Sequence, residues 1–134
     1  MTRPSDPTPE SCRHLVLVVD DDLPVAERIA DALEAAGFDV QHTQDYDLAY
    51  LACFSLRPSV LVLDQIVATP GGERLLRRLD KLPGAPPVLV LRFAPGPYGA
   101  FARLRVAVLG GRGWFEELPE VVRRLDPTSA LGPS

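Results

Sequence analysis

The stretch Ser59-Val60-Leu61-Val62-Leu63-Asp64 is a run of apolar residues that closes on a carboxylate. An earlier apolar run, 15–19, ends at the three consecutive aspartates 20–22, about 40 residues before Asp64. Two such runs with a helical pattern between them are typical of strands in a parallel α/β sheet. The carboxyl ends of those strands lie at one edge of the sheet, where such folds bind ligands. The sequence therefore predicts a carboxylate cluster at that edge, whose repulsion a divalent cation or protonation must offset.

The rest of the chain alternates between helical and strand-like hydrophobic patterns with short connections. Helices and strands are predicted over 24–36, 38–42, 45–56, 73–82 and 88–91. With the two apolar runs above, this gives the order βαβαβαβ. The order predicts an α/β fold, a doubly wound five-stranded parallel sheet with right-handed crossovers and helices on both faces.

The helix predicted over 45–56 is apolar at helical spacing, like those before and after it. Its inward side is expected to carry Leu48, Leu51, Ala52 and Leu56.

The last third of the chain is compatible with two registers. In one, 98–109 is the fourth helix and Trp114-Phe115 is the fifth strand. In the other, 105–109 is the fifth strand and the helix before it is short or absent. Both registers place a final helix that ends near residue 125, because four apolar residues share one face. These are Phe115, Leu118, Val122 and Leu125.

Size and composition predict one globular domain over 14–126, between a disordered leader (1–13) and a short polar tail (127–134). The chain has 134 residues, of which 46% are hydrophobic. No apolar run approaches the roughly 20 residues of a membrane span, and the N-terminus lacks the apolar core of a signal peptide. A cytoplasmic protein is expected, with Cys12 and Cys53 as reduced thiols.

The charge pattern argues against nucleic acid as a partner. The net charge is −4, and the chain contains a single lysine. Arg74, Arg77, Arg78 and Lys81 do line up at helical spacing, but no aromatic residues interleave with them. We expect them to form a solvated helix face.

Over about residues 14–126 the chain resembles the receiver domain of two-component response regulators. The resemblance rests on the order and spacing of several features together. These are the acidic run 20–22, Asp64, Gly72, Pro87-Val88 and the glycine-rich turn 110–115.

The resemblance implies a phosphorylation site with a metal ion. Asp64 would be the phosphoacceptor, and Asp20, Asp21 and Asp64 would hold Mg²⁺ together with the main-chain carbonyl of Ile66. Mg²⁺ prefers oxygen ligands, and it would stabilise charge on a phosphoryl group moving to Asp64. The other interpretation is that the aspartates only cap the following helix, which suits Asp22 best.

The chain departs from the family at the residues that read out phosphorylation. Receivers place Thr or Ser at the end of the fourth strand, then a small residue, and a lysine after the fifth strand. Here the first two positions are Arg92 and Phe93, and the only lysine, Lys81, lies on the third predicted helix. The chain therefore keeps the acceptor and metal residues and loses the residues that sense the phosphoryl group.

Arg92 has two possible roles. Its guanidinium would either pair with both oxygens of Asp64 and mimic a bound cation, or point into solvent. Phe93 would shield the site or cap the core. Trp114, in the first register, would take the aromatic switch position of receivers, and otherwise would anchor the core.

Two functional hypotheses follow from the resemblance. We expect a stand-alone, atypical receiver that acts through protein–protein contact, with an output that depends weakly or not at all on phosphorylation. The alternative is a conventional receiver, phosphorylated on Asp64 by a histidine kinase with Mg²⁺. Because no effector domain follows, output is expected through a partner protein or a homodimer, on the surface from the fourth strand to the last helix. No enzymatic activity and no membrane contact are expected.

A third hypothesis comes from the spacing of Asp20 and Asp22. Asp-x-Asp after a strand also resembles the nucleophile loop of haloacid-dehalogenase-type phosphatases. Those enzymes need a distant lysine, a second acidic pair and a cap, and the chain offers only Lys81 for these roles.

Overall fold

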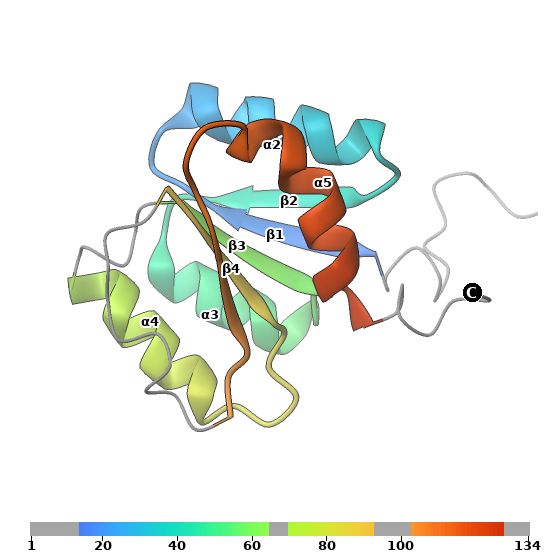
Figure 1. The fold of residues 1–134 in the computed structure, drawn as a ribbon. Coiled ribbons are helices and arrows are strands. Elements are labelled where there is room, and N and C mark those ends of the chain that lie inside the picture. Colours follow the sequence, from blue (N-terminus) through green and yellow to red (C-terminus); the bar gives the residue numbers. More distant parts are fainter. Residues whose placement is uncertain (1–13, 65–69, 93–102, 128–134) are drawn as a thin grey trace, which may run out of the picture.

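The computed structural model describes residues 14–64, 70–92 and 103–127, and five parallel strands form its centre (Figure 1). The strands lie in the order β2-β1-β3-β4-β5. They are β1 (Leu15–Val19), β2 (Asp39–Thr43), β3 (Val60–Asp64), β4 (Val88–Leu91) and β5 (Val106–Leu109). The chain starts inside the sheet, adds β2 on one side and the other strands on the opposite side, so its winding reverses between β1 and β3. The predicted doubly wound five-stranded sheet is confirmed.

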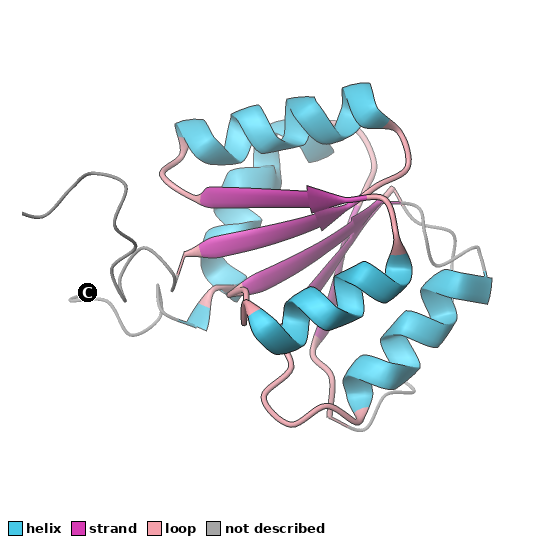
Figure 2. Cartoon of the chain, turned by 180° about the vertical axis from the view of Figure 1, so that it is seen from behind, coloured by secondary structure: helices cyan, strands magenta, loops and turns pink. Residues whose placement is uncertain are grey.

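Helices cover both faces of the sheet, as Figures 1 and 2 show. They are α2 (Leu23–Ala35), α3 (Tyr46–Ser55), α4 (Pro70–Asp80) and α5 (Trp114–Leu125). One buried cluster joins the sheet to Leu33 of α2 and Val122 of α5. A second buried cluster joins the opposite face to Cys53 of α3 and Leu79 of α4. The fold is therefore three layers with an apolar core on each side of the sheet.

The central strands are apolar at every position because both of their faces are covered. In β1, Val16 and Val18 belong to the cluster under α2 and α5, whereas Leu17 and Val19 belong to the cluster under α3 and α4. The edge strand β2 has no fully buried residue. This contrast is the usual one between inner and edge strands of a parallel sheet.

The second of the two registers for the end of the chain is correct. Val106 pairs with Val88 in the parallel ladder between β4 and β5, and Trp114 begins α5. The alternative with a helix over 98–109 and a fifth strand at Trp114-Phe115 is wrong. A short apolar run has no decisive period of its own, and only pairing with β4 selects the strand. Residues 93–102, where the second register would place a short fourth helix, lie outside the described residues.

The inward face predicted for the helix over 45–56 is wrong for its three leucines, whereas Ala52 is partly buried and packs against the core, as predicted. Ala49 and Cys53 of α3 are buried against the sheet, while Leu48, Leu51 and Leu56 are about half exposed. Nearly every position of this helix is apolar, so periodicity does not single out one face. The two small residues allow α3 to lie close to the sheet, and this packing turns the leucines outward.

Among the residues that the structure describes, every helix is too short or too polar to cross a lipid bilayer.

Candidate functional site at the carboxyl edge of the sheet

Two buried carboxylates lie at the carboxyl edge of neighbouring strands. Asp20 directly follows β1, and Asp64 is the last residue of β3, which pairs with β1. Both residues are buried, whereas Asp21 and Asp22 are exposed. The predicted cluster therefore assembles around Asp20 and Asp64, and Asp21 lies at its solvent side.

Asp22 is the N-cap of α2. Its Oδ1 accepts a hydrogen bond from the main-chain N–H of Val25 at 3.3 Å, which satisfies one of the free donors of the first turn. Its own N–H donates to Oδ1 of Asp20 at 2.9 Å. The capping interpretation is therefore confirmed for Asp22, and this residue also orients Asp20.

Arg92 lies directly after β4 and pairs with Asp64. Its Nε donates to Oδ1 of Asp64 at 2.9 Å, and its second guanidinium nitrogen donates to Oδ2. The Asp64 side chain is 1% exposed and the Arg92 side chain 29%. Of the two predicted orientations, the structure therefore has the bidentate pair. Both oxygens of the candidate phosphoacceptor accept from a fixed cation.

The backbone and an aromatic ring hold Arg92 in this orientation. The main-chain N–H of Arg92 donates to the carbonyl of Leu109 at 3.0 Å, and its φ is 48°. The guanidinium also lies over the ring of Trp114, 5.3 Å from its centroid. This contact between Trp114 and Arg92 was missed, because it depends on α5 beginning at Trp114. The fifth-strand position predicted for Trp114 in the first register is wrong.

The electrostatics of the two carboxylates differ. Burial, reinforced by the neighbouring Asp64, raises the pKa of Asp20 to about 7. The hydrogen bonds to Asp64 raise the pKa of Arg92 further above its ordinary value. No described residue bonds the buried Oδ2 of Asp20. When Asp20 is protonated and Asp64 is paired with the guanidinium, the two carboxyl groups do not repel each other. The cluster is then stable without a metal ion.

This arrangement does not fit Mg²⁺. The free Oδ2 of Asp20 is a suitable hard donor. However, both oxygens of Asp64 accept from Arg92, and the described residues contain no group of three or more acidic, histidine or cysteine side chains placed to hold a metal. Ile66 and Phe93 lie outside the described residues. The predicted metal ligands therefore stay a prediction, and they require Arg92 to leave Asp64.

The two histidines have structural contacts. Nε2 of His42 donates a hydrogen bond of 2.9 Å to the main-chain carbonyl of Asp20, which joins β2 to the site edge. His14 lies 3.0 Å from the fully buried carboxylate of Asp126, at the opposite end of the sheet. The second contact joins the start of β1 to the end of α5, and no pattern in the sequence indicated it.

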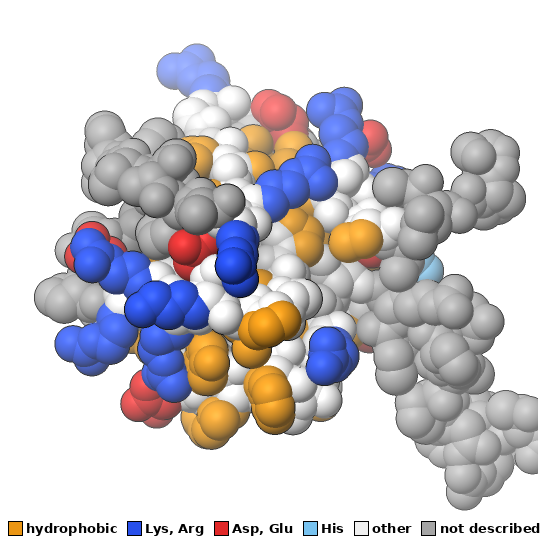
Figure 3. Space-filling model, turned by 90° about the horizontal axis from the view of Figure 1, so that it is seen from below, with side chains coloured by type: hydrophobic (Ala, Val, Ile, Leu, Met, Phe, Trp, Pro, Cys, Tyr) orange, Lys and Arg blue, Asp and Glu red, His pale blue; other side chains and the backbone are white. Residues whose placement is uncertain are grey.

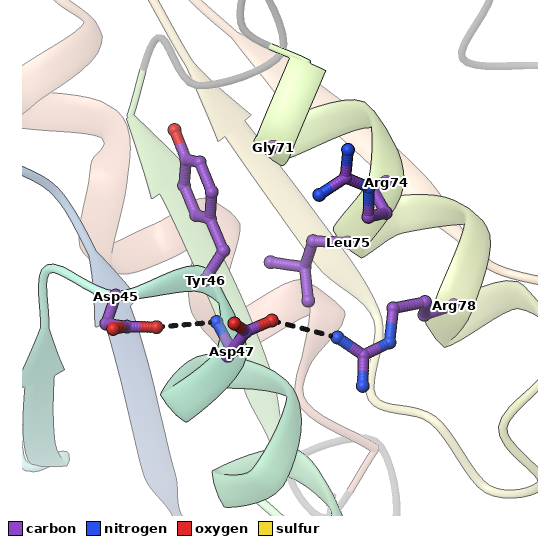
Figure 4. A pocket seen from close by; sticks show the side chains of 7 residues that line it. All are labelled: Asp45, Tyr46, Asp47, Gly71, Arg74, Leu75 and Arg78. Atoms are coloured by element: carbon purple, nitrogen blue, oxygen red, sulfur yellow. Dashed lines mark hydrogen bonds and ion pairs between the residues drawn. The ribbon is translucent and has the colours of Figure 1, made fainter.

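A polar hollow of about 310 Å³ lies between α3 and α4, separate from these carboxylates (Figure 4). Its lining residues are Asp45, Tyr46, Asp47, Gly71, Arg74, Leu75 and Arg78. Arg78 donates to Asp47 at 3.1 Å and stacks over the ring of Tyr50, with 3.9 Å to the centroid. The sequence indicated the basic side of this hollow only as a solvated helix face.

Comparison of the sequence with known proteins finds bacterial response regulators. The chain is 33% identical over 78 residues to the phosphate regulon transcriptional regulatory protein PhoB of Pseudomonas aeruginosa, covering 57% of this chain and 34% of PhoB. It is 33% identical over 81 residues to the DNA-binding response regulator MtrA of Mycobacterium tuberculosis, covering 60% of this chain and 36% of MtrA. The chain thus spans about a third of the length of these relatives. No protein-family model matches the sequence.

Comparison of the structure finds receiver domains. The Francisella response regulator 1452 receiver domain is similar with a TM-score of 0.70 and 25% identity, covering 86% of this chain and 98% of that one. The pseudo-receiver domain of the CikA protein is similar with a TM-score of 0.62 and 25% identity, covering 85% and 97%. The protein described as FixJ-N is similar with a TM-score of 0.69 and 26% identity, covering 84% and 93%. In fold and in sequence, the chain is similar to response-regulator receiver domains.

Proposed function

We propose that this chain, a response-regulator receiver domain of two-component signalling by its fold and its relatives, is an atypical receiver that acts through protein–protein contact. Its output depends weakly or not at all on phosphorylation of Asp64. The observation that carries this proposal is the bidentate contact between Arg92 and Asp64. An incoming phosphoryl group has to take one oxygen of Asp64, and both oxygens already accept from the guanidinium.

Displacing Arg92 is costly because Asp64 is buried. A buried carboxylate that loses its partner keeps its desolvation penalty without the compensating attraction. Phosphorylation would also bring a dianionic group next to Asp20 without the family's lysine, since the only lysine is Lys81 on α4. Phosphorylation is therefore less favourable at this site than at one with a free acceptor, a lysine and a metal ion.

The proposed coupling between phosphorylation of Asp64 and the conformation of the rest of the molecule is also weak. A ligand shifts a conformational equilibrium only by the difference between its affinities for the two states. In this chain the guanidinium already supplies a cation at the acceptor in the unmodified state. The unmodified state is thus proposed to be the binding-competent one, and histidine kinases and effector proteins remain the expected classes of partner.

The test is incubation with Mg²⁺ and a small acyl phosphate, followed by intact mass measurement. We expect little modification of the wild type and none of Asp64→Asn. Arg92→Thr restores the family's hydroxyl and frees Asp64, so its modified fraction should rise. Because a β-branched residue is strained at a φ of 48°, Arg92→Asn, which tolerates that backbone, is the matched variant.

A wild type that is modified as fully as Arg92→Asn would overturn the proposal. It would support the conventional phospho-receiver, which is favoured by one observation, namely that Asp20 and Asp64 are both buried at the same strand edge. Partner binding also separates the two functions. Equal binding of the wild type and Asp64→Asn would support the phosphorylation-independent receiver, because a phospho-switch would lose its partner in that variant.

A further inference from the structure

The outer face of α3 carries an unusual set of exposed apolar side chains. Among the described residues, six large hydrophobic side chains are exposed, and four of them come from one segment of nine residues. They are Leu48 (56% exposed), Leu51 (55%), Phe54 (62%) and Leu56 (47%). Single exposed leucines are ordinary, but a contiguous group of this kind marks an interaction site. Figure 3 shows hydrophobic side chains gathered over α3 on the lower face of the molecule.

Three of these side chains form a stripe along the helix. Leu48, Leu51 and Phe54 follow one another at intervals of three residues, on the side of α3 opposite to the buried Ala49 and Cys53. Residues three apart form one of the ridges that pack into the grooves of another helix. The stripe is about 9 Å long, at 1.5 Å per residue, so it matches about two turns of a partner helix. We call Leu48, Leu51 and Phe54 the α3 stripe, and the exposed Leu56 lies just beyond it at the C-cap of the helix.

A mainly basic rim flanks the α3 stripe, most of it from α4 (Figure 3). Arg57, Arg74, Arg77, Arg78 and Lys81 supply its cations, and Asp45, Asp47, Glu73 and Asp80 its carboxylates. Within the rim, Arg78 pairs with Asp47 and Arg77 pairs with Glu73. The cations outnumber the carboxylates on this face, although the whole chain has a net charge of −4. The charge at this surface is therefore opposite in sign to that of the molecule.

We propose that the α3 stripe and its rim bind an amphipathic helix of another protein, whose apolar face is flanked by acidic side chains. The stripe supplies apolar area for such a helix, and the cations of α4 lie where its carboxylates would fall. The hollow lined by Tyr46 and Leu75 lies beside the stripe, between α3 and α4, and accepts a side chain at the edge of the contact. This surface is distinct from the face between the fourth strand and the last helix.

Other occupants fit this surface less well. A second copy placed by two-fold symmetry would bring the basic rim against itself, which costs energy. Binding to a bilayer scales with the apolar area that is buried, and the α3 stripe offers only a few side chains. The leader 1–13 is the segment TRPSDPTPESCR after Met1, so it lacks the large apolar residues needed to cover the stripe.

The test uses the whole chain and a fluorescent synthetic helix with a leucine face flanked by glutamates. Its binding is followed by anisotropy against the same peptide with lysines in place of the glutamates. Binding should weaken about tenfold or more for the lysine peptide and for the double variant Leu51→Ser/Phe54→Ser. Leu23→Ser on α2 removes a side chain of similar exposure (47%) away from the stripe and should leave binding unchanged.

Each remaining outcome counts against the proposal. Equal binding of both peptides, or equal loss in Leu23→Ser, would show non-specific apolar contact. Concentration-dependent dimerisation that Leu51→Ser/Phe54→Ser abolishes would assign the α3 stripe to a second copy. Sedimentation with vesicles of phosphatidylcholine and phosphatidylglycerol would assign it to a membrane.

Two controls accompany this test. Because the exposed side chains contribute little to folding, urea unfolding should match among the variants. Arg92→Asn should bind the glutamate peptide like the wild type, so this test does not depend on the proposed role of Asp64.

Discussion

Arg92 and Asp64 form a two-point contact at the carboxyl edge of the sheet, with the arginine held in a left-handed backbone conformation at a φ of 48°. That conformation costs a non-glycine residue about 1–2 kcal/mol. The pair with Asp64 and the main-chain bond to the carbonyl of Leu109 offset this cost. The chain thus places a permanent cation at the carboxylate where a receiver would accept a phosphoryl group.

Removing the cation should destabilise the fold. Arg92→Asn leaves Asp64 buried without its partner, and we expect the free energy of unfolding at pH 7 to fall by about 3 kcal/mol, at the low end for a broken buried pair because Arg92 is partly exposed. Urea unfolding measures this. Arg92→Lys keeps the charge but not the two-point geometry, so its loss should be smaller.

The same variant should respond to magnesium. In Arg92→Asn the oxygens of Asp64 become free for a hard cation, and Mg²⁺ should raise the melting temperature by mass action. The wild type should show little change. An equal rise in both proteins would mean that Arg92 leaves Asp64 readily when metal is added.

The stability of the wild type should fall as the pH rises from about 4 to about 7. Burial and the neighbouring Asp64 raise the pKa of Asp20 from 3.8 to about 7, so in this range the folded chain holds a proton that the unfolded chain has released. The contribution is fully present below the unfolded pKa and lost as the pH rises through the folded one. Over this window it amounts to roughly a few kcal/mol.

Urea unfolding at a series of pH values, with chelator present, checks this dependence. Asp20→Asn is the control, because an amide does not titrate and should give a flatter profile over the same range. Identical slopes for the wild type and Asp20→Asn would show that other groups carry the dependence.

Gly71 should not tolerate a side chain, although alanine is the better helix former. A Cβ at this position in the first turn of α4 would overlap ring carbons of Tyr46. We expect Gly71→Ala to lower stability by about 1–3 kcal/mol, as other overpacked sites do. In the background of Tyr46→Ala the same substitution should cost much less, and a double-mutant cycle in urea measures the coupling. Additive costs would place the strain elsewhere.

Cys53 should react only when the protein unfolds. Its side chain is buried between α3 and the sheet, and burial raises its pKa to about 12, so the thiolate is scarce at neutral pH. Iodoacetamide followed by peptide mapping should show slow labelling of Cys53 in buffer and rapid labelling in urea. Fast labelling in buffer would indicate that α3 opens locally.

The sequence by itself determined the first four strands of the sheet and the position of its acidic edge. The run from Val60 to Leu63 is apolar at every residue because the strand is buried on both faces, and this local pattern is visible without any structure. Since parallel strands end at the same edge, the sequence placed the carboxylates of Asp20 and Asp64 at one edge of the sheet. The helix α4 has one clear apolar face in its sequence, and Leu75 and Leu79 on that face are buried.

The tertiary structure decided the features that local sequence patterns leave open. The segment 106–109 became a strand because β4 offered a partner for its backbone, and the leucines of α3 turned outward because Ala49 and Cys53 pack more closely on the sheet. The orientation of Arg92 depends on Asp64, 28 residues earlier, and on Trp114, which begins a helix of the last segment. Hydrophobic periodicity reports which residues share a face of one element, whereas these contacts join separate elements, and their geometry exists only once the layers are packed.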